Sequence, residues 1–322
     1  MSWQNEYVRL LGCVDPKELD IEEAMRLKNI NIPAKLYKYR PASDYALENL
    51  RTDTVWLNKP SEYNDPFEFA EYLDFDRINQ ALKAQGIFDG VEYFSSVYPL
   101  PAHVVEVAKS KVDPLLWVAE YVLRENGRSE SNIDMFKEAI RYVLDREHSR
   151  TQEWKINLMQ NNMKVSSFCE SPDQLLMWSH YAAFHTGFCV EYSIESWPLA
   201  DIRRRLLHPV FYSETRFDAT DHLIQSFRGQ GIINPLYSLI SGATKSKEWA
   251  YEKEWRLIFN IGNSFPQQNY NMNCQTKVYL GYRISPENQK KVISICQERR
   301  IPVVQATLSP SHYKLDYIDV EH

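Results

Sequence analysis

The stretch Glu-Lys-Glu-Trp-Arg-Leu-Ile-Phe at residues 252–259 combines four charged residues with large apolar ones. Successive side chains of a β-strand point to opposite faces, so a strand that begins at Glu252 carries Glu252, Glu254 and Arg256 on one face. A solvated edge strand with a weak salt bridge explains the same pattern without any function. The lysine-rich segment that leads into it, with Trp249, favours the lining of a pocket.

Similar short strands are predicted on both sides of a long helical stretch. The predicted strands cover residues 36–39, 54–57, 164–168, 187–192, 209–212, 254–259, 277–280 and 302–305. The predicted helices cover residues 17–28, 44–51, 102–124 with a break at Pro114, 131–160, 172–184, 219–243 and 286–298. Because strands from both ends of the chain surround the helices, we expect one sheet system. The predicted fold class is α+β, with a core of residues 1–75 and 161–322 and an all-helical insertion at 76–160.

Composition and charge exclude several classes of protein. The chain has 322 residues, of which 44% are hydrophobic and 25% charged, as in ordinary soluble globular proteins. With only ten glycines it contains neither of the common glycine-rich phosphate-binding fingerprints. A net charge of −6 argues against coating of duplex nucleic acid but leaves room for a small catalytic groove. Five scattered cysteines predict reduced thiols, and we expect a cytoplasmic protein without a signal peptide or membrane span.

Four segments concentrate polar groups among aromatic residues, as a pocket lining does. They are residues 36–40, 64–68, 177–188 and 249–256, and we expect them to converge on one cleft. In the second segment, Asp65 and Glu68 are more simply explained by a helix capping box, which leaves Asn64 open.

In the third segment, His180 and His185 are five residues apart on the predicted helix. This spacing separates them by roughly 140° around the axis and does not suit a paired zinc site. A polar-network role is therefore the default for His180, and contact with a ligand is the alternative.

The four segments resemble, in the same order, the motifs of a bacterial domain-of-unknown-function family. The motifs here are Lys38-Tyr-Arg40, Asn64-Asp-Pro-Phe-Glu68, Leu176-Met-Trp-Ser-His-Tyr181 with His185-Thr-Gly-Phe188, and Trp249-Ala-Tyr-Glu-Lys-Glu-Trp-Arg256. The resemblance runs from about residue 35 to residue 282 and skips the helical insertion.

The order of strand, helix and strand over residues 36–57, with Arg40 on the first strand, is similar to the beginning of the ADP-ribosyltransferase fold. The late Glu252-Lys-Glu254 is similar to the Glu-x-Glu of such enzymes, whose second glutamate is catalytic. The middle Ser-Thr-Ser motif of that fold is absent, and an aromatic-histidine helix stands in its place. The resemblance implies a split β-sheet core and a toxin that uses NAD as co-substrate without a metal. It further implies a nucleic-acid acceptor (RNA or DNA), an anti-phage or toxin–antitoxin setting, an antitoxin or chaperone partner, and no membrane.

The chemistry of NAD cleavage suits these residue types. Breaking the nicotinamide–ribose bond develops positive charge at C1′, which the carboxylate of Glu254 would stabilise. Glu252 would orient or deprotonate the acceptor, and Arg40 would hold a ribose or pyrophosphate oxygen. The complete predicted cofactor-binding set is Arg40, Tyr37, Tyr39, Asn64, His180, Tyr181 and Arg256, where the tyrosines offer stacking surfaces.

Two other functions remain open from the sequence. A metal-dependent nuclease would draw its ligands from Asp65, Glu68, His180, Glu252 and Glu254, against the unfavourable histidine spacing. A non-catalytic module would bind a nucleotide or a partner protein without any reaction. The acidic charge also permits a protein acceptor.

Overall fold

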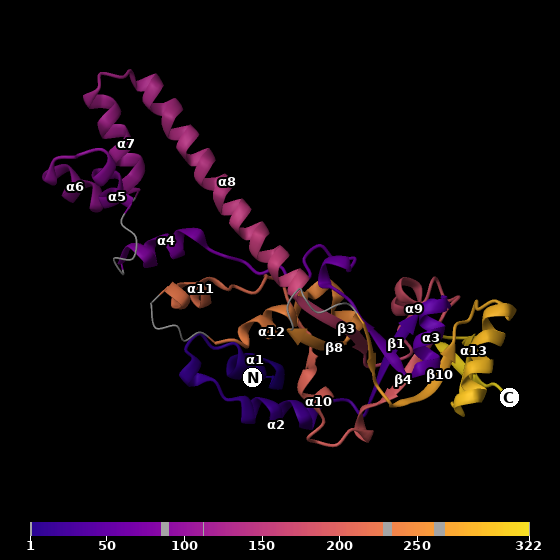
Figure 1. The fold of residues 1–322 in the computed structure, drawn as a ribbon. Coiled ribbons are helices and arrows are strands. Elements are labelled where there is room, and N and C mark those ends of the chain that lie inside the picture. Colours follow the sequence, from indigo (N-terminus) through magenta and orange to yellow (C-terminus); the bar gives the residue numbers. More distant parts are fainter. Residues whose placement is uncertain (1, 85–89, 112, 228–233, 261–267, 322) are drawn as a thin grey trace.

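The computed structural model describes residues 2–84, 90–111, 113–227, 234–260 and 268–321, and it has a mixed α+β fold, as predicted (Figure 1). Eight strands form one sheet in the order β12-β11-β10-β4-β1-β3-β8-β5, and two strand pairs, β2-β9 and β6-β7, stand apart from it. All neighbours in the large sheet are antiparallel except β10 and β11. The strands are β1 (Lys35–Arg40), β2 (Thr54–Leu57), β3 (Met163–Cys169), β4 (Phe188–Ser193), β5 (Leu207–Pro209), β6 (Phe211–Ser213), β7 (Thr244–Ser246), β8 (Glu254–Asn260), β9 (Gln268–Asn271), β10 (Gln275–Leu280), β11 (Val303–Leu308) and β12 (Leu315–Asp319).

The sheet opens between β1 and β3. These strands share a single residue pair, Tyr37 opposite Cys169, whereas β1 pairs with β4 over six positions and β3 with β8 over seven. Beyond Tyr37 no β1 residue is paired with β3 through the backbone. The sheet therefore divides into five strands on the β1 side and three on the β3 side.

Apolar side chains bury both faces of the sheet. On one face, Leu36 and Val190 pack with Leu47 and Leu50 of the helix that follows β1. Ser43 caps this helix, since its hydroxyl accepts the amide of Ala46. On the other face, the helix before β4 buries Trp178, whose ring packs edge-on against Tyr39. The helices on the described residues are α1 (Trp3–Leu11), α2 (Ile21–Asn31), α3 (Asp44–Thr52), α4 (Phe75–Ala84), α5 (Gly90–Val97), α6 (Ala102–Lys109), α7 (Pro114–Glu125), α8 (Glu130–Asn162), α9 (Leu175–Tyr181), α10 (Ile202–Leu206), α11 (Thr220–Phe227), α12 (Tyr237–Gly242) and α13 (Pro286–Arg299).

The described elements between Phe75 and Asn162 are all helices. Helix α8 has 33 residues and extends away from the sheet; α7 packs against it, and α5 and α6 pack against α7 (Figure 1). The predicted break at Pro114 is present, because Pro114 is the first residue of α7 and Asp113 caps it. No helix in the described parts of the chain is both long enough and apolar enough to cross a lipid bilayer.

The strand predicted at residues 254–259 is present as β8. It does not extend back to Glu252, because residues 247–252 form a 3₁₀ helix and Lys253 has a left-handed φ of 44°. Several other predicted boundaries are wrong. The helix expected from residue 172 begins at Leu175, because the Ser171 hydroxyl instead accepts the amide of Asp173 in a turn.

The predicted helix at 219–243 is two helices, α11 and α12, and residues 228–233 between them lie outside the described residues. The strand expected at 209–212 is divided between β5 and β6. Helix α1 and the strands β7, β9 and β12 were not predicted.

Candidate functional site

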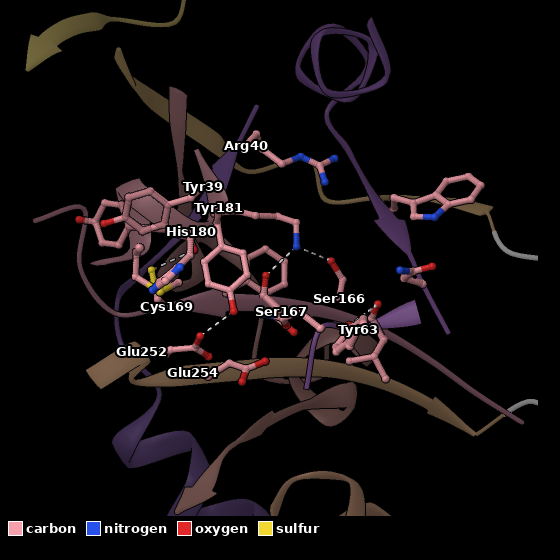
Figure 2. A pocket seen from close by; sticks show the side chains of 18 of the residues that line it. Tyr39, Arg40, Tyr63, Ser166, Ser167, Cys169, His180, Tyr181, Glu252 and Glu254 are labelled. Carbon is pink, nitrogen blue, oxygen red and sulfur yellow. Dashed lines mark hydrogen bonds between the residues drawn. The ribbon is translucent and has the colours of Figure 1, made fainter. Parts of the chain in front are cut away.

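A cavity of about 450 Å³ lies where the sheet opens between β1 and β3 (Figure 2). All four motif segments contribute to its lining, although they span more than 200 residues of sequence. The lining includes eight of the nine predicted site residues, namely Tyr37, Tyr39, Arg40, Asn64, His180, Tyr181, Glu252 and Glu254. The ninth, Arg256, is completely buried behind Glu254 and does not line the cavity.

One side of the cavity is cationic. Lys38 and Arg40 are two apart on β1, so both side chains leave the strand on the same face. The Lys38 ammonium donates to the Ser166 hydroxyl at 3.0 Å and to the Ser167 carbonyl at 2.6 Å, across the opening. The Arg40 guanidinium donates to the side-chain oxygen of Asn49. Neither cation forms an ion pair with a carboxylate in the described part of the chain.

The surroundings of Lys38 disfavour its charged form, although Glu254 acts in the opposite direction. Burial, together with the charge of Arg40, lowers the pKa of Lys38 to about 7. An anionic ligand in this part of the cavity would restore the balance of charge for both side chains.

The opposite side of the cavity carries two carboxylates, which Figure 2 shows across the opening from Arg40. The Glu252 carboxylate accepts the Tyr181 hydroxyl at 2.7 Å and the Lys245 ammonium at 2.7 Å. The Lys245 ammonium also lies 3.2 Å from a Glu254 oxygen. The left-handed Lys253 turns the chain between the two glutamates, so both reach Lys245 although only Glu254 is on the strand.

Behind these carboxylates lies a second layer of buried charge. The Arg256 guanidinium donates two hydrogen bonds to the Glu254 carboxylate, from Nε at 2.7 Å and from Nη2 at 2.9 Å. Arg256 also donates to Glu68 at 2.8 Å, and Lys245 lies 3.5 Å from the same carboxylate. When all are ionised, the group of Glu68, Glu252, Glu254, Lys245 and Arg256 has three negative and two positive charges. This buried charge group then has a net charge of −1.

The two glutamates that face the cavity differ in acidity. Burial alone would raise the pKa of Glu254, but the charges of Arg256 and Lys245 outweigh it and lower the pKa to about 2. Burial and the neighbouring Glu254 raise the pKa of Glu252, against the opposing effect of Lys245. Glu254 is thus a permanent anion at neutral pH, whereas Glu252 is the carboxylate better suited to accept a proton.

The prediction that Glu68 closes a capping box is wrong. The Asp65 carboxylate does accept the amide of Phe67 at 2.9 Å, but residues 66–69 form a turn, not a helix. The Glu68 carboxylate instead contacts Arg256, which lies 188 residues further along the chain. A guanidinium with no exposed surface is costly unless carboxylates surround it, which explains the recruitment of Glu68 as well as Glu254.

The aromatic candidates are placed differently from one another. The hydroxyl of Tyr37 donates to Glu191 and that of Tyr39 to the Ser171 carbonyl, so both tyrosines are tied into the sheet. Tyr181 presents its hydroxyl to Glu252 inside the cavity, and His180 is exposed beside it.

Sequence reasoning missed Lys38 and Lys245 as site residues. For Lys38 a signal was present, since it shares a strand face with Arg40. For Lys245 the only signal was its place in the lysine-rich segment that precedes Trp249.

The carboxylates that a metal-dependent nuclease would need are already engaged. Glu68, Glu252 and Glu254 form ion pairs with Lys245 or Arg256. In the described residues, no group of three or more histidine, cysteine, aspartate or glutamate side chains is arranged to hold a metal ion.

Comparison with known proteins gives one match. Residues 177–257 match a family described as "Protein of unknown function (DUF2971)". This segment runs from α9 into β8 and therefore contains the cavity residues His180, Tyr181, Glu252 and Glu254. No curated protein and no solved structure matches the chain. The match supports the presence of a domain of unknown function.

Proposed function

We propose that the chain is an NAD-dependent ADP-ribosyltransferase whose active site is the cavity between β1 and β3. The observation that carries the proposal is the separation of charge across this cavity. Cations without a carboxylate partner in the described residues, Lys38 and Arg40, stand on one side, and Glu252 and Glu254 stand on the other (Figure 2). NAD has the complementary distribution, with an anionic pyrophosphate and a cationic nicotinamide riboside.

The two sides of the cavity would hold the two ends of this substrate. Arg40 and Lys38 would donate charge-assisted hydrogen bonds to pyrophosphate oxygens. The nicotinamide riboside would then lie toward Glu254, where the excess negative charge of the buried charge group favours a cation. The cavity volume of about 450 Å³ is within the range of small-molecule sites.

The reaction follows from the acidities of the two glutamates. The bond between C1′ and nicotinamide breaks, and nicotinamide leaves as a neutral molecule with the bonding electron pair. Glu254, ionised at any physiological pH, stabilises the oxocarbenium ion that forms at C1′. The acceptor attacks C1′, and its proton passes to the Glu252 carboxylate, whose pKa is raised.

We further propose a nucleic-acid acceptor, RNA or DNA, in an anti-phage or toxin–antitoxin setting in the cytoplasm. The support is the similarity to the ADP-ribosyltransferase fold, which includes toxins that modify nucleic acids. An antitoxin or chaperone that neutralises the activity belongs to the same proposal.

The proposal is tested by release of nicotinamide from NAD, measured with and without single-stranded RNA or DNA. We expect release by the wild-type protein, and transfer of labelled ADP-ribose to the nucleic acid. Glu252→Gln should reduce transfer more than hydrolysis of NAD, because the glycosidic bond breaks without an acceptor base. Glu248→Gln, on the exposed side of the same 3₁₀ helix, is the matched control and should change neither.

Other outcomes of this experiment identify the alternatives. Binding of NAD without release of nicotinamide indicates a non-catalytic nucleotide-binding module. Cleavage of nucleic acid that needs a divalent cation but no NAD indicates a nuclease.

A further inference from the structure

A second cavity of about 510 Å³ lies directly beside the first. Lys245 lines both cavities, and the adjacent residues Phe67 and Glu68 line the second and the first respectively. The second cavity is bounded by β6 and β7, by the end of α12 and by the segment that follows Glu68. None of the nine predicted site residues lines it.

Hydroxyl groups dominate the polar lining of the second cavity, which includes Ser213, Thr215, Ser241, Thr244 and Ser246. Ser241 is 3% exposed, and its hydroxyl has no hydrogen-bond partner within the described residues. A buried hydroxyl without a partner costs free energy, so a donor or acceptor from a ligand would be favourable here.

The mouth of the second cavity combines aromatic rings with a cation. Phe67 is 59% exposed and Tyr72 is 40% exposed, although both are large apolar side chains. The guanidinium carbon of Arg216 lies 5.8 Å from the centre of the Tyr72 ring, and Arg216 forms no ion pair with a described residue. The carboxylate at this rim, Glu214, is already paired with Lys247 at 2.9 Å.

These groups match the parts of a nucleotide. Exposed aromatic rings stack on bases of any sequence. An arginine without a carboxylate partner binds a phosphate, and hydroxyl groups bond to base edges or to the sugar. The volume admits one nucleotide but not a folded polypeptide segment.

We propose that the second cavity binds one nucleotide of a single-stranded acceptor, next to the nucleotide that is modified in the first cavity. The role as acceptor site rests on the proposed function, whereas the binding of a nucleotide does not. The shared Lys245 places the two cavities close enough for adjacent nucleotides of one strand to reach both.

The test is binding of a fluorescein-labelled ten-residue oligothymidylate or oligoadenylate, followed by anisotropy in the absence of NAD. Unlabelled AMP or TMP as competitor distinguishes a site for free nucleotides from one that needs a strand. We expect Arg216→Gln to weaken oligonucleotide binding by about tenfold or more, and Ser241→Ala by about threefold to tenfold. Arg128→Gln removes the same charge from an exposed position on the helical insertion and should have no effect.

Stability and activity measurements complete the test. Ser241→Ala should not lower the thermal midpoint below that of the wild type, because the removed hydroxyl has no hydrogen-bond partner in the described residues. Both cavity variants should still release nicotinamide from NAD when no nucleic acid is present. Oligonucleotide binding that is absent, or equal in the wild type and both variants, overturns the inference. If the binding pattern holds but the wild type releases no nicotinamide, the proposed function fails and the nucleotide site stands.

Discussion

The substitution Glu254→Gln tests whether the buried charge group forms as described. It keeps the size of the side chain and removes only the negative charge that faces Arg256. Arg256 has no exposed surface and would keep a single carboxylate partner, Glu68. Removing one partner of a buried ion pair costs about 3–5 kcal/mol of folding free energy.

The lowered pKa of Glu254 gives the same order of magnitude for this free energy. Its pKa falls from an ordinary value of 4.5 to about 2 on folding. At about 1.4 kcal/mol for each tenfold change in acidity, the ionised form contributes about 3 kcal/mol to stability. Because the pKa is lowered in the folded state, this contribution is complete above pH 4.5 and is lost as the pH falls toward 2.

The assay is urea unfolding followed by far-ultraviolet circular dichroism at pH 7, 5 and 3. The difference in unfolding free energy between the wild type and Glu254→Gln should be about 3 kcal/mol at pH 7 and smaller at pH 3. Nicotinamide release by the folded variant should fall by about 10²-fold, the effect of losing one electrostatic partner of a transition state. A difference below about 1 kcal/mol at pH 7, or one that does not change with pH, would refute the buried charge group.

Three further predictions concern the cationic side of the cavity and its support. Arg40→Gln should raise the KM for NAD by about tenfold or more, with a smaller change in kcat. The reason is that the pyrophosphate, the proposed partner of Arg40, carries its charge both in the bound substrate and in the transition state. Steady-state measurement of nicotinamide release gives both constants. Binding of NAD should weaken as the pH rises from 6 to 8, because Lys38 loses its charge near pH 7, and calorimetry should show no such dependence for Lys38→Met. Gly187→Ala should yield little soluble, folded protein, because the added carbon would lie 2.0 Å from the Arg40 carbonyl oxygen. Gly127→Ala is the control: its added carbon meets no atom within 4 Å, and it should lower the unfolding free energy by only about 1 kcal/mol in a melting assay.

Several strands follow from the sequence alone. Residues 36–39, 54–57 and 164–168 are short segments with β-branched or aromatic residues, and each forms a strand within one or two residues of the predicted limits. Among the strands that were missed, β9 (Gln268–Asn271) has a polar sequence, and its strand conformation comes with its pairing to β2.

The candidate site, too, could be predicted from the sequence only in part. Clusters of polar and aromatic residues indicate which segments line a cavity, because such clusters are unusual elsewhere in a core. The Arg256–Glu68 pair joins residues 188 positions apart and therefore has no local signal. Lys245 and Glu252 are seven residues apart, but their contact depends on the 3₁₀ helix between them. A glutamate at position 68 suits both a capping box and a buried ion pair, and the packing around it determines that it pairs with Arg256.

The single residue pair between β1 and β3 has a consequence for local opening of the protein. Strands β3, β8 and β5 hold together through many backbone hydrogen bonds, but the register joins them to the other five strands at Tyr37 and Cys169 alone. Backbone regions with few shared contacts exchange their amide hydrogens without global unfolding. The two parts of the sheet should therefore exchange as separate units. A ligand that spans the opening would slow exchange along both edges at once, which makes hydrogen–deuterium exchange a direct measure of its occupancy.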